Sequence, residues 1–157
     1  MQKKYTDSFI QFSTSFGWLT VFVTTKGINR IEFGKSCTGK QRDEKNKLLQ
    51  KVKKDILSYI DGKKVKFAYP LDISLTPFQK KALKEVEKIP YGKTISYKEL
   101  ARRTKNYPRA CGQAVAKNPI PIIIPCHRVI EANGGLGGFG GGLQWKIKLL
   151  KLEKSNQ

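Results

Sequence analysis

Alternation of apolar and polar residues in the first part of the chain predicts a small antiparallel sheet. Residues 9–12 and 18–23 have the composition and period of β-strands, with Gly17 between them. Residues 28–33 form a third such segment after the turn signal Lys26-Gly27. Because the three segments follow one another with short connections, we expect an antiparallel meander.

A helical period replaces the alternation after a polar loop over residues 34–42. From Glu44 onward, apolar residues recur every three or four positions, and Gly62 supplies a stop signal. The periodic residues are Leu48, Val52, Ile56 and Tyr59. Residues 64–73 have no regular period and are expected to be extended or irregular. The first domain, an α/β domain with a structural supporting role, is therefore predicted to span residues 1–75.

The remaining residues, 76–157, predict a series of short helices. Thr76 is a suitable N-cap with Pro77 at the first helical position, and the capping-box pattern S-Y-K-E at residues 96–99 predicts a second start. Pro108 opens a third helix, and an amphipathic helix closes the chain. The residues expected on the buried faces are Phe78, Ala82, Leu83 and Val86; Leu100 and Ala101; Cys111, Ala114 and Val115; and Leu149, Leu150 and Leu152.

Two of these short helices, joined by a tight turn, suggest a helix-turn-helix. The second one, over residues 109–117, has small side chains that allow close approach to another surface, and Arg109 and Lys117 flank it with positive charge. The same pattern is also typical of a close-packed helix pair that never contacts DNA. The predicted fold class is α+β: a small N-terminal antiparallel β-sheet domain with a helix, followed by a mostly helical C-terminal domain with a helix-turn-helix.

The net charge adds a preference for a polyanionic partner. The chain has 31 Lys and Arg against 12 Asp and Glu, a formal net charge of +19, and the excess is spread over both halves. Neutralised phosphates release counterions, so nucleic acid is the simplest such partner. We see neither a secretory signal nor an apolar run of membrane-spanning length, and we expect a cytoplasmic protein without a membrane partner.

The only histidine, His127, directly follows Cys126 in the run P-I-P-I-I-I-P-C-H-R-V at residues 119–129. A thiol attacks electrophiles as the thiolate, and a neighbouring imidazole or guanidinium stabilises that anion. Here His127 and Arg128 supply both groups. We therefore expect Cys126 to be a nucleophile at the end of a short apolar strand that proline stops. For an isolated thiol, an ordinary buried cysteine would be the better interpretation.

A glycine-rich segment follows, with seven glycines among residues 134–142. Such a run permits backbone shapes closed to other residues and lets a ligand touch the main chain. Phe139 within it favours a pocket wall over a flexible linker. A phosphate-binding loop is less expected, because the segment has neither the pattern G-x-x-x-x-G-K-[ST] nor a G-x-G-x-x-G pattern in a strand-to-helix context.

The cysteines exclude several classes of site. Cys37, Cys111 and Cys126 are widely spaced, and a single histidine cannot complete a zinc site of the usual spacing. We therefore expect no metal and no cofactor. A papain-like peptidase would need a histidine far downstream, and a thioredoxin-like oxidoreductase would need a second nearby cysteine. A substrate embedded in DNA fits the charge and the helix-turn-helix, provided that the base leaves the stack.

Residues 125–129 (P-C-H-R-V) resemble the active-site signature of the O6-alkylguanine-DNA alkyltransferases, the methylated-DNA–protein-cysteine methyltransferases. Further segments resemble that family in order and at similar spacing: F-Q at 78–79, I-P-Y-G-K-T at 89–94, S-Y-K-E-L-A at 96–101, Arg109-Ala110 with Gly112, and Asn118-Pro119. The likeness covers residues 76–153, whereas the N-terminal half matches only as a small strand-rich domain ending in a helix.

The resemblance implies DNA repair by direct reversal. Cys126 would take the alkyl group from O6 of guanine in double-stranded DNA, irreversibly and once per molecule. His127 would act as a base through a water molecule, and Glu153 would orient it. The recognition helix would lie in the minor groove and the damaged base would be flipped out. A monomer without an obligate protein partner is expected.

The resemblance also implies roles for other side chains. Asn118 would brace the turn before the active site, Tyr97 would crowd the target phosphate, and Arg109 would fill the gap left by the flipped base. The remaining expected DNA contacts are Ala110, Gly112, Lys117 and Arg128, and the expected pocket residues are Pro121, Phe139 and Gly140. Many relatives have tyrosine and serine where this chain has Phe139-Gly140, so a hydroxyl and a side-chain donor are lost here.

Two other functions remain open from the sequence. A non-catalytic, alkyltransferase-like lesion-binding protein would replace the nucleophile, whereas Cys126 is intact. A DNA-binding regulator with a redox-sensing cysteine would prefer one operator sequence. The repair hypothesis instead predicts a preference for the lesion with little sequence preference, as minor-groove binding allows.

Overall fold

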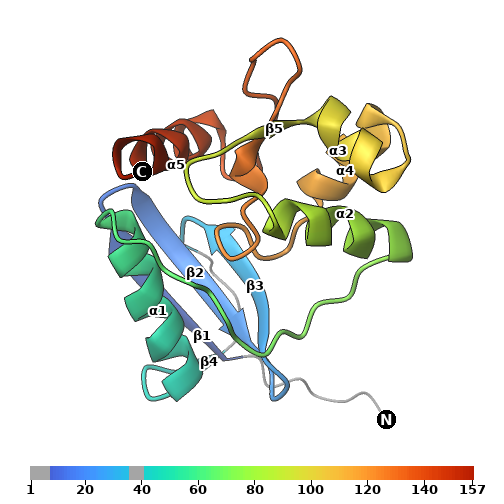
Figure 1. Cartoon of the computed structure of the whole chain (residues 1–157). Helices are drawn as coiled ribbons and strands as arrows, with labels where there is room; N and C mark the ends of the chain where they lie inside the picture. The colour runs from blue at the N-terminus through green and yellow to red at the C-terminus, as the bar shows by residue number, and fades with distance from the viewer. Residues whose placement is uncertain (1–7, 36–40) are drawn as a thin grey trace. The chain divides into compact units, whose positions relative to one another are not determined.

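The computed structural model describes residues 8–35 and 41–157. The chain divides into two compact units, Met1–Ile73 and Ser74–Gln157, and the predicted boundary after residue 75 lies two residues from this division. Figure 1 shows a sheet with one helix in the first unit and a mostly helical second unit, which confirms the α+β class. Across the described residues, no helix combines the length and the apolar character needed to cross a bilayer.

The first unit contains a four-stranded sheet in the order β3-β2-β1-β4. The predicted antiparallel meander is confirmed, with strands β1 (Ser8–Thr14), β2 (Gly17–Val23) and β3 (Ile28–Phe33). Strand β4 (Gln41–Arg42) pairs in parallel with β1. The sequence did not predict β4, because two residues inside a polar loop carry no detectable period.

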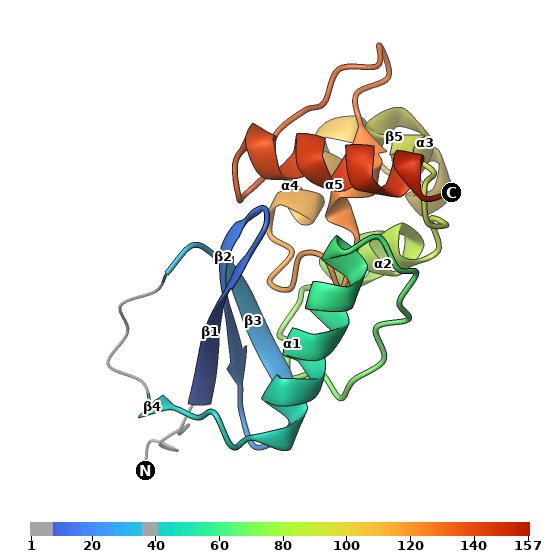
Figure 2. The ribbon, with the colours of Figure 1, turned by 90° about the vertical axis from the view of Figure 1, so that its left-hand side faces the viewer.

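Helix α1 (Lys47–Ile60) lies along one face of this sheet, as the two views in Figures 1 and 2 show. The Asn46 side chain caps its start by accepting from two backbone N–H groups. Its buried residues are Leu49, Val52, Ile56, Tyr59 and Ile60. The structure buries Leu49, which the predicted pattern did not include, and leaves Leu48 half-buried; both lie about one turn before Val52.

The predicted helices of the second unit are confirmed. They are α2 (Pro77–Glu87), α3 (Tyr97–Thr104), α4 (Pro108–Ala116) and α5 (Leu143–Ser155). Thr76 and Gln79 form a reciprocal capping box, and Ser96 Oγ accepts a hydrogen bond of 3.0 Å from Glu99 N. Helix α3 ends at Lys105, whose left-handed backbone (φ 54°) turns the chain toward α4. Helices α2, α3 and α4 pack against one another.

Two short strands that the sequence did not predict join the parts of the candidate site. Strand β5 (Ile95–Ser96) pairs in parallel with β6 (Val129–Ile130). β5 ends where α3 begins, and β6 follows directly after the single-turn 3₁₀ helix η1 (Cys126–Arg128). This pairing therefore fixes the candidate nucleophile relative to the first helix of the helix-turn-helix.

The segment before Cys126 is a turn, and the expectation of an apolar strand there was wrong. Ile124 N donates a hydrogen bond of 3.0 Å to the Ile120 carbonyl, and Ile122 has a positive φ of 74°. The prolines explain the difference, because Pro119, Pro121 and Pro125 have no backbone N–H to donate to a sheet. Most of the apolar residues from 120 to 125 are buried, but they form a compact turn and not a strand.

Candidate active site

Cys126 is the first residue of η1 and carries a free thiol. Its backbone N–H donates a hydrogen bond of 2.8 Å to the Ile124 carbonyl, so the turn and the 3₁₀ helix together fix the direction of the side chain. The residue is 6% exposed. The sulfur therefore lies at the margin of the interior, where its neighbours rather than bulk water determine its chemistry.

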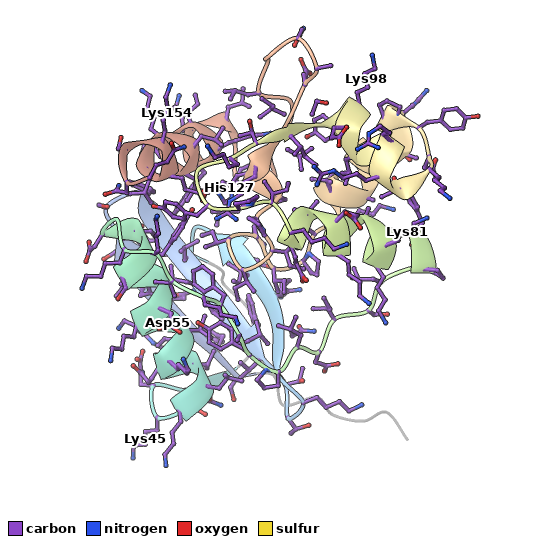
Figure 3. All side chains as sticks on the ribbon, in the orientation of Figure 1. Lys45, Asp55, Lys81, Lys98, His127 and Lys154 are labelled. Carbon is purple, nitrogen blue, oxygen red and sulfur yellow. The ribbon has the colours of Figure 1, made fainter. Side chains whose placement is uncertain are left out.

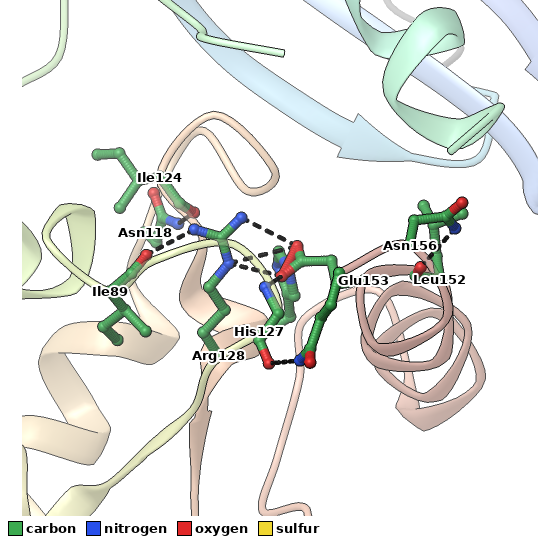
Figure 4. A network of polar contacts seen from close by, with 10 residues as sticks. Ile89, Asn118, Ile124, His127, Arg128, Leu152, Glu153 and Asn156 are labelled. Carbon is green, nitrogen blue, oxygen red and sulfur yellow. Dashed lines mark hydrogen bonds and ion pairs between the residues drawn. The ribbon is translucent and has the colours of Figure 1, made fainter. Parts of the chain in front are cut away.

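Asn118 connects the end of α4 to this turn, as Figure 4 shows. Its Nδ2 donates to the Ile124 carbonyl at 2.9 Å, and its Oδ1 accepts from Ile120 N at 3.1 Å. The same side chain hydrogen-bonds the Cys126 sulfur and lowers the pKa of that thiol. Asn118 thus shapes the turn and also contacts the sulfur, which is more than the bracing role that the resemblance implied.

Burial is the largest influence on the Cys126 thiol and raises its pKa above the ordinary value. The opposing influences are the Asn118 hydrogen bond, the charge of Lys146 and the backbone N–H groups of Cys126 and His127. In the absence of DNA, the thiol is therefore held protonated. We expected Arg128 to stabilise the thiolate; the structure instead directs its guanidinium elsewhere, and Lys146 is the cation that favours the thiolate.

His127 is fully buried, and its Nε2 lies 2.7 Å from Oε2 of Glu153, which is 1% exposed. A carboxylate can only accept, so this nitrogen is assigned the proton and Nδ1 is the basic position. Burial lowers the pKa of His127, the Glu153 carboxylate raises it, and the charges of Arg128 and Lys146 lower it again. The imidazole is therefore neutral at physiological pH.

Arg128, which the sequence analysis assigned to DNA, is engaged inside the site. Its Nε and Nη2 donate to the Glu153 carboxylate at 2.7 and 3.0 Å, and its Nη1 donates to the Ile89 carbonyl at 2.7 Å. Figure 4 shows the guanidinium between these two acceptors. Only 12% of the side chain is exposed. We therefore correct the assignment and place Arg128 in the active-site network.

Lys146 is a site residue that the sequence analysis missed. It is fully buried in α5, and its Nζ donates to the carbonyls of Val129 at 2.8 Å, Gly138 at 3.4 Å and Leu136. The signal was present in the sequence: Lys146 precedes Leu149 by three residues, so it falls on the buried face of the helix. A lysine at a core position is the feature that could have identified it.

Tyr97, at the start of α3, lies against the glycine-rich segment. A Cβ at Gly137 would be 3.0 Å from Tyr97 Cε2, and the positive φ of 71° at Gly137 also favours glycine. Burial raises the pKa of Tyr97, and Cys126 and Glu131 raise it further. The structure therefore brings the hydroxyl-bearing ring into the electrostatic neighbourhood of the sulfur.

The other predicted site residues differ in exposure. Three of them are exposed: Arg109 and Lys117, at the two ends of α4, and Gly140. Three are half-buried, namely Ala110, Gly112 and Phe139, and one, Pro121, is buried in the turn.

Figure 3 shows labelled lysines of the second unit, such as Lys81 and Lys98, projecting outward while His127 lies within the fold. Within the described ranges, His, Cys, Asp and Glu form no metal-binding cluster. Cys37, the third cysteine of the chain, lies outside the described residues.

The fold and this site define a class of protein: a two-unit chain whose helical unit holds a thiol beside a histidine–glutamate pair and a helix-turn-helix. Two family models match, described as the DNA binding domain (residues 77–155) and the ribonuclease-like domain (residues 8–73) of 6-O-methylguanine DNA methyltransferase. The chain belongs to this family, the methylated-DNA–protein-cysteine methyltransferases.

Individual relatives agree over nearly the whole chain. The methylated-DNA–protein-cysteine methyltransferase of Saccharolobus solfataricus is 39% identical over 142 residues, 90% of this chain and 92% of the relative. Among solved structures, the Mycobacterium tuberculosis O6-methylguanine methyltransferase is similar with a TM-score of 0.85 and 33% identity, covering 96% of this chain and 94% of that chain. OGT from the same organism, solved in complex with DNA, gives a TM-score of 0.84 at 34% identity, covering 95% of this chain and 94% of that chain.

Proposed function

We propose that this chain repairs O6-alkylguanine in double-stranded DNA by direct reversal, transferring the alkyl group to its own Cys126. The observation that carries the proposal is the buried relay beside the thiol, in which His127 Nε2 lies 2.7 Å from the Glu153 carboxylate. This arrangement leaves Nδ1 as a base and gives the resulting imidazolium a counter-charge. A thiol with such a base is the requirement for nucleophilic attack on an alkyl carbon.

The reaction is a single displacement at the alkyl carbon. The Cys126 proton passes through a water molecule to His127 Nδ1, and the sulfur attacks the carbon attached to O6. The new S–C bond forms as the C–O6 bond breaks. The electron pair of the broken bond stays on O6 of the guanine. The guanine anion then takes a proton and remains in the DNA as neutral guanine, while the protein keeps a thioether. The Lys146 charge and the Asn118 hydrogen bond favour the developing thiolate.

We infer that each molecule acts once. A thioether is stable, and its removal would need a separate reaction. The other described thiol, Cys111, is fully buried in α4, with its sulfur 3.4 Å from Thr104 Oγ1. Cys111 therefore serves the packing of α3 against α4 and not the regeneration of Cys126.

Duplex DNA would bind through the helix-turn-helix formed by α3 and α4. Arg109, exposed at the start of α4, would enter the space of an extruded base, and Lys117, exposed after its last turn, would contact phosphate. The small Ala110 and Gly112 allow the close approach that minor-groove binding requires. The first unit would act as a structural support, and a monomer suffices for this chemistry.

We also propose that the protein acts in the cytoplasm. Its acceptor must be a reduced thiol, and Cys111 and Cys126 are both free. Reducing conditions and access to DNA together support this location.

The test of the proposed function is a mass measurement. The protein is incubated with a duplex that contains one O6-methylguanine, and its intact mass is compared with that of protein incubated with the unmodified duplex. We expect the mass of one methylene group to be added, mapped to Cys126 and absent in Cys126→Ala. Tight binding to the lesion without any mass change would instead support the non-catalytic lesion-binding alternative.

A further inference from the structure

Arg128 connects three parts of the second unit that are distant in sequence. Its guanidinium donates to both oxygens of the Glu153 carboxylate in α5 and to the Ile89 carbonyl, just after α2. Its charged carbon lies 5.8 Å from the centre of the Tyr91 ring. Such a bidentate geometry fixes both the position and the rotation of a carboxylate.

Glu153 therefore has two cationic or potentially cationic partners. His127 Nε2 lies 2.7 Å from its Oε2, and Arg128 Nε lies 2.7 Å from its Oε1. The Gly92 N–H also donates to Oε1 at 3.2 Å. A buried carboxylate that already has a permanent cation gains less from a second one, because the first cation has neutralised most of its field.

We propose that Arg128 is a positioning residue, which acts through Glu153 to keep the His127 imidazole neutral and thus able to accept the Cys126 proton. Without the guanidinium, the Glu153 carboxylate would stabilise a protonated imidazole in the resting protein. Such an imidazolium could not serve as a base. Arg128 thus allows Glu153 to orient the imidazole ring. It also prevents the carboxylate from stabilising a protonated ring before the reaction begins.

The charged groups around His127 act in opposite directions. From α5, Glu153 favours the imidazolium and Lys146 disfavours it; within η1, Arg128 disfavours it. Burial raises the pKa of Tyr91, in the turn after α2; Glu153 raises it further and Arg128 lowers it. Burial of the ring acts in the same direction as the two cations. The carboxylate is thus the group whose effect Arg128 must offset.

The inference rests on the proposed role of His127 as a base, but its principal test requires no DNA. His127 is the only histidine in the chain, so its ring nitrogens give unambiguous NMR signals. We expect the wild-type ring to be the neutral Nε2–H tautomer at neutral pH and to become protonated only below the ordinary histidine pKa. In Arg128→Gln, we expect the His127 pKa to rise by about one unit or more. The reason is that the Glu153 carboxylate then has no permanent cation beside it and stabilises the protonated ring.

Three further variants assign the cause of this rise. Arg128→Lys keeps the charge but not the bidentate geometry, so its shift should lie between wild type and Arg128→Gln. The double variant Arg128→Gln with Glu153→Gln removes both charges, and its His127 should again remain neutral. Arg30→Gln, which removes an arginine from the Arg30–Glu32 pair in the first unit, should titrate as wild type.

A merely structural salt bridge would give a different result. A folded Arg128→Gln whose His127 titrates as in wild type overturns the proposal, and so does an equal rise in the double variant. If Arg128→Gln does not fold, Arg128→Lys decides alone, and an unchanged His127 signal then overturns it.

A kinetic measurement separates this inference from the proposed function. If the wild-type protein transfers methyl groups, the acid limb of its rate–pH profile should move to higher pH in Arg128→Lys, by the same shift as the NMR titration. If the wild-type protein transfers none, the proposed function fails, and the NMR result still decides whether Arg128 controls the protonation of His127.

Discussion

Lys146 donates a hydrogen bond of 2.8 Å to the Val129 carbonyl, and the same ammonium holds the carbonyls of Leu136 and Gly138. One buried side chain of α5 therefore holds strand β6 and the glycine-rich segment together. Its charge also favours the Cys126 thiolate. Shape and charge at the candidate site thus depend on the same residue.

Lys146→Met should weaken both the fold and the nucleophile. The buried carbonyls would lose their donor, at about 1–3 kcal/mol for an unsatisfied group, and the pKa of Cys126 should rise further. Thermal unfolding and the pH dependence of Cys126 alkylation, mapped by mass spectrometry, measure the two effects. Lys151→Met, an exposed position on the same helix, is the matched control and should change neither. Unchanged thiol reactivity in Lys146→Met would refute the electrostatic role.

Asn118→Ala should destabilise the second unit by about 1–3 kcal/mol, because it leaves Ile120 N and the Ile124 carbonyl without their side-chain partner. It should also raise the pKa of the Cys126 thiol, since a hydrogen bond to the sulfur is lost. Urea unfolding and thiol alkylation rates test these points. Asn106→Ala, in the exposed turn between α3 and α4, is the control for removal of a turn asparagine, and its thiol should react as in wild type.

The contribution of His127 to the stability of the protein should fall as the pH drops below about 6.5. The pKa of His127 is lowered in the folded protein, so below about 6.5 the unfolded chain binds a proton that the folded one does not. Stability from this group is complete above the unfolded pKa and declines as the pH falls, with a slope approaching about 1.4 kcal/mol per pH unit. His127→Gln removes the titration, and its unfolding free energy should be flatter in this window. Equal slopes in the two proteins would contradict the prediction.

Arg109→Ala should slow repair of duplex DNA by at least about tenfold while it leaves the reaction with a free O6-alkylguanine base unchanged. The reason is that an extruded base in a duplex needs its gap filled, whereas a free base does not. Single-turnover rates on the two substrates measure this. Arg42→Ala, an exposed arginine of β4, is the control and should be normal on both. An equal loss on both substrates would remove the assigned role.

Gly140→Ser should increase the rate with a free O6-alkylguanine base. A Cβ at Gly140 meets no atom within 4 Å, so the serine fits without strain and returns a hydroxyl donor to the expected pocket. Gly138→Ser is the control, since that position is equally open. A gain of the same size in Gly138→Ser would mean that reduced loop flexibility, and not the donor, is the cause.

Local signals in the sequence sufficed for the helices and for the sheet of the first unit. Thr76, Ser96 and Pro108 mark helix starts that the structure has, because caps and prolines act within a few residues. The short pairs β1–β4 and β5–β6 were missed, since two-residue strands depend on distant partners. The strand expected before Cys126 failed because its prolines leave too few donors for a sheet.

The His127–Glu153 pair could be predicted from the resemblance, but the partners of Arg128 and Lys146 could not. Cys126, His127 and Glu153 came from the motif and the resemblance, and the structure places His127 against Glu153. Arg128 was expected among the DNA contacts that the resemblance implies. Only the three-dimensional fold shows that Glu153, 25 residues later, lies beside it. Sequence adjacency to Cys126 proved a poor guide to which cation acts on the sulfur.

Ile122 keeps a left-handed backbone that a β-branched residue adopts only under constraint, and its side chain is almost fully buried. Glycine at this position would relieve the backbone strain but would lose the packing of a large aliphatic side chain. Isoleucine and glycine would therefore each destabilise the turn in a different way. The backbone that leads to the sulfur thus depends on the packing of the Ile122 side chain. Repair in which the damaged nucleotide leaves the double helix and enters the protein requires no movement of this turn.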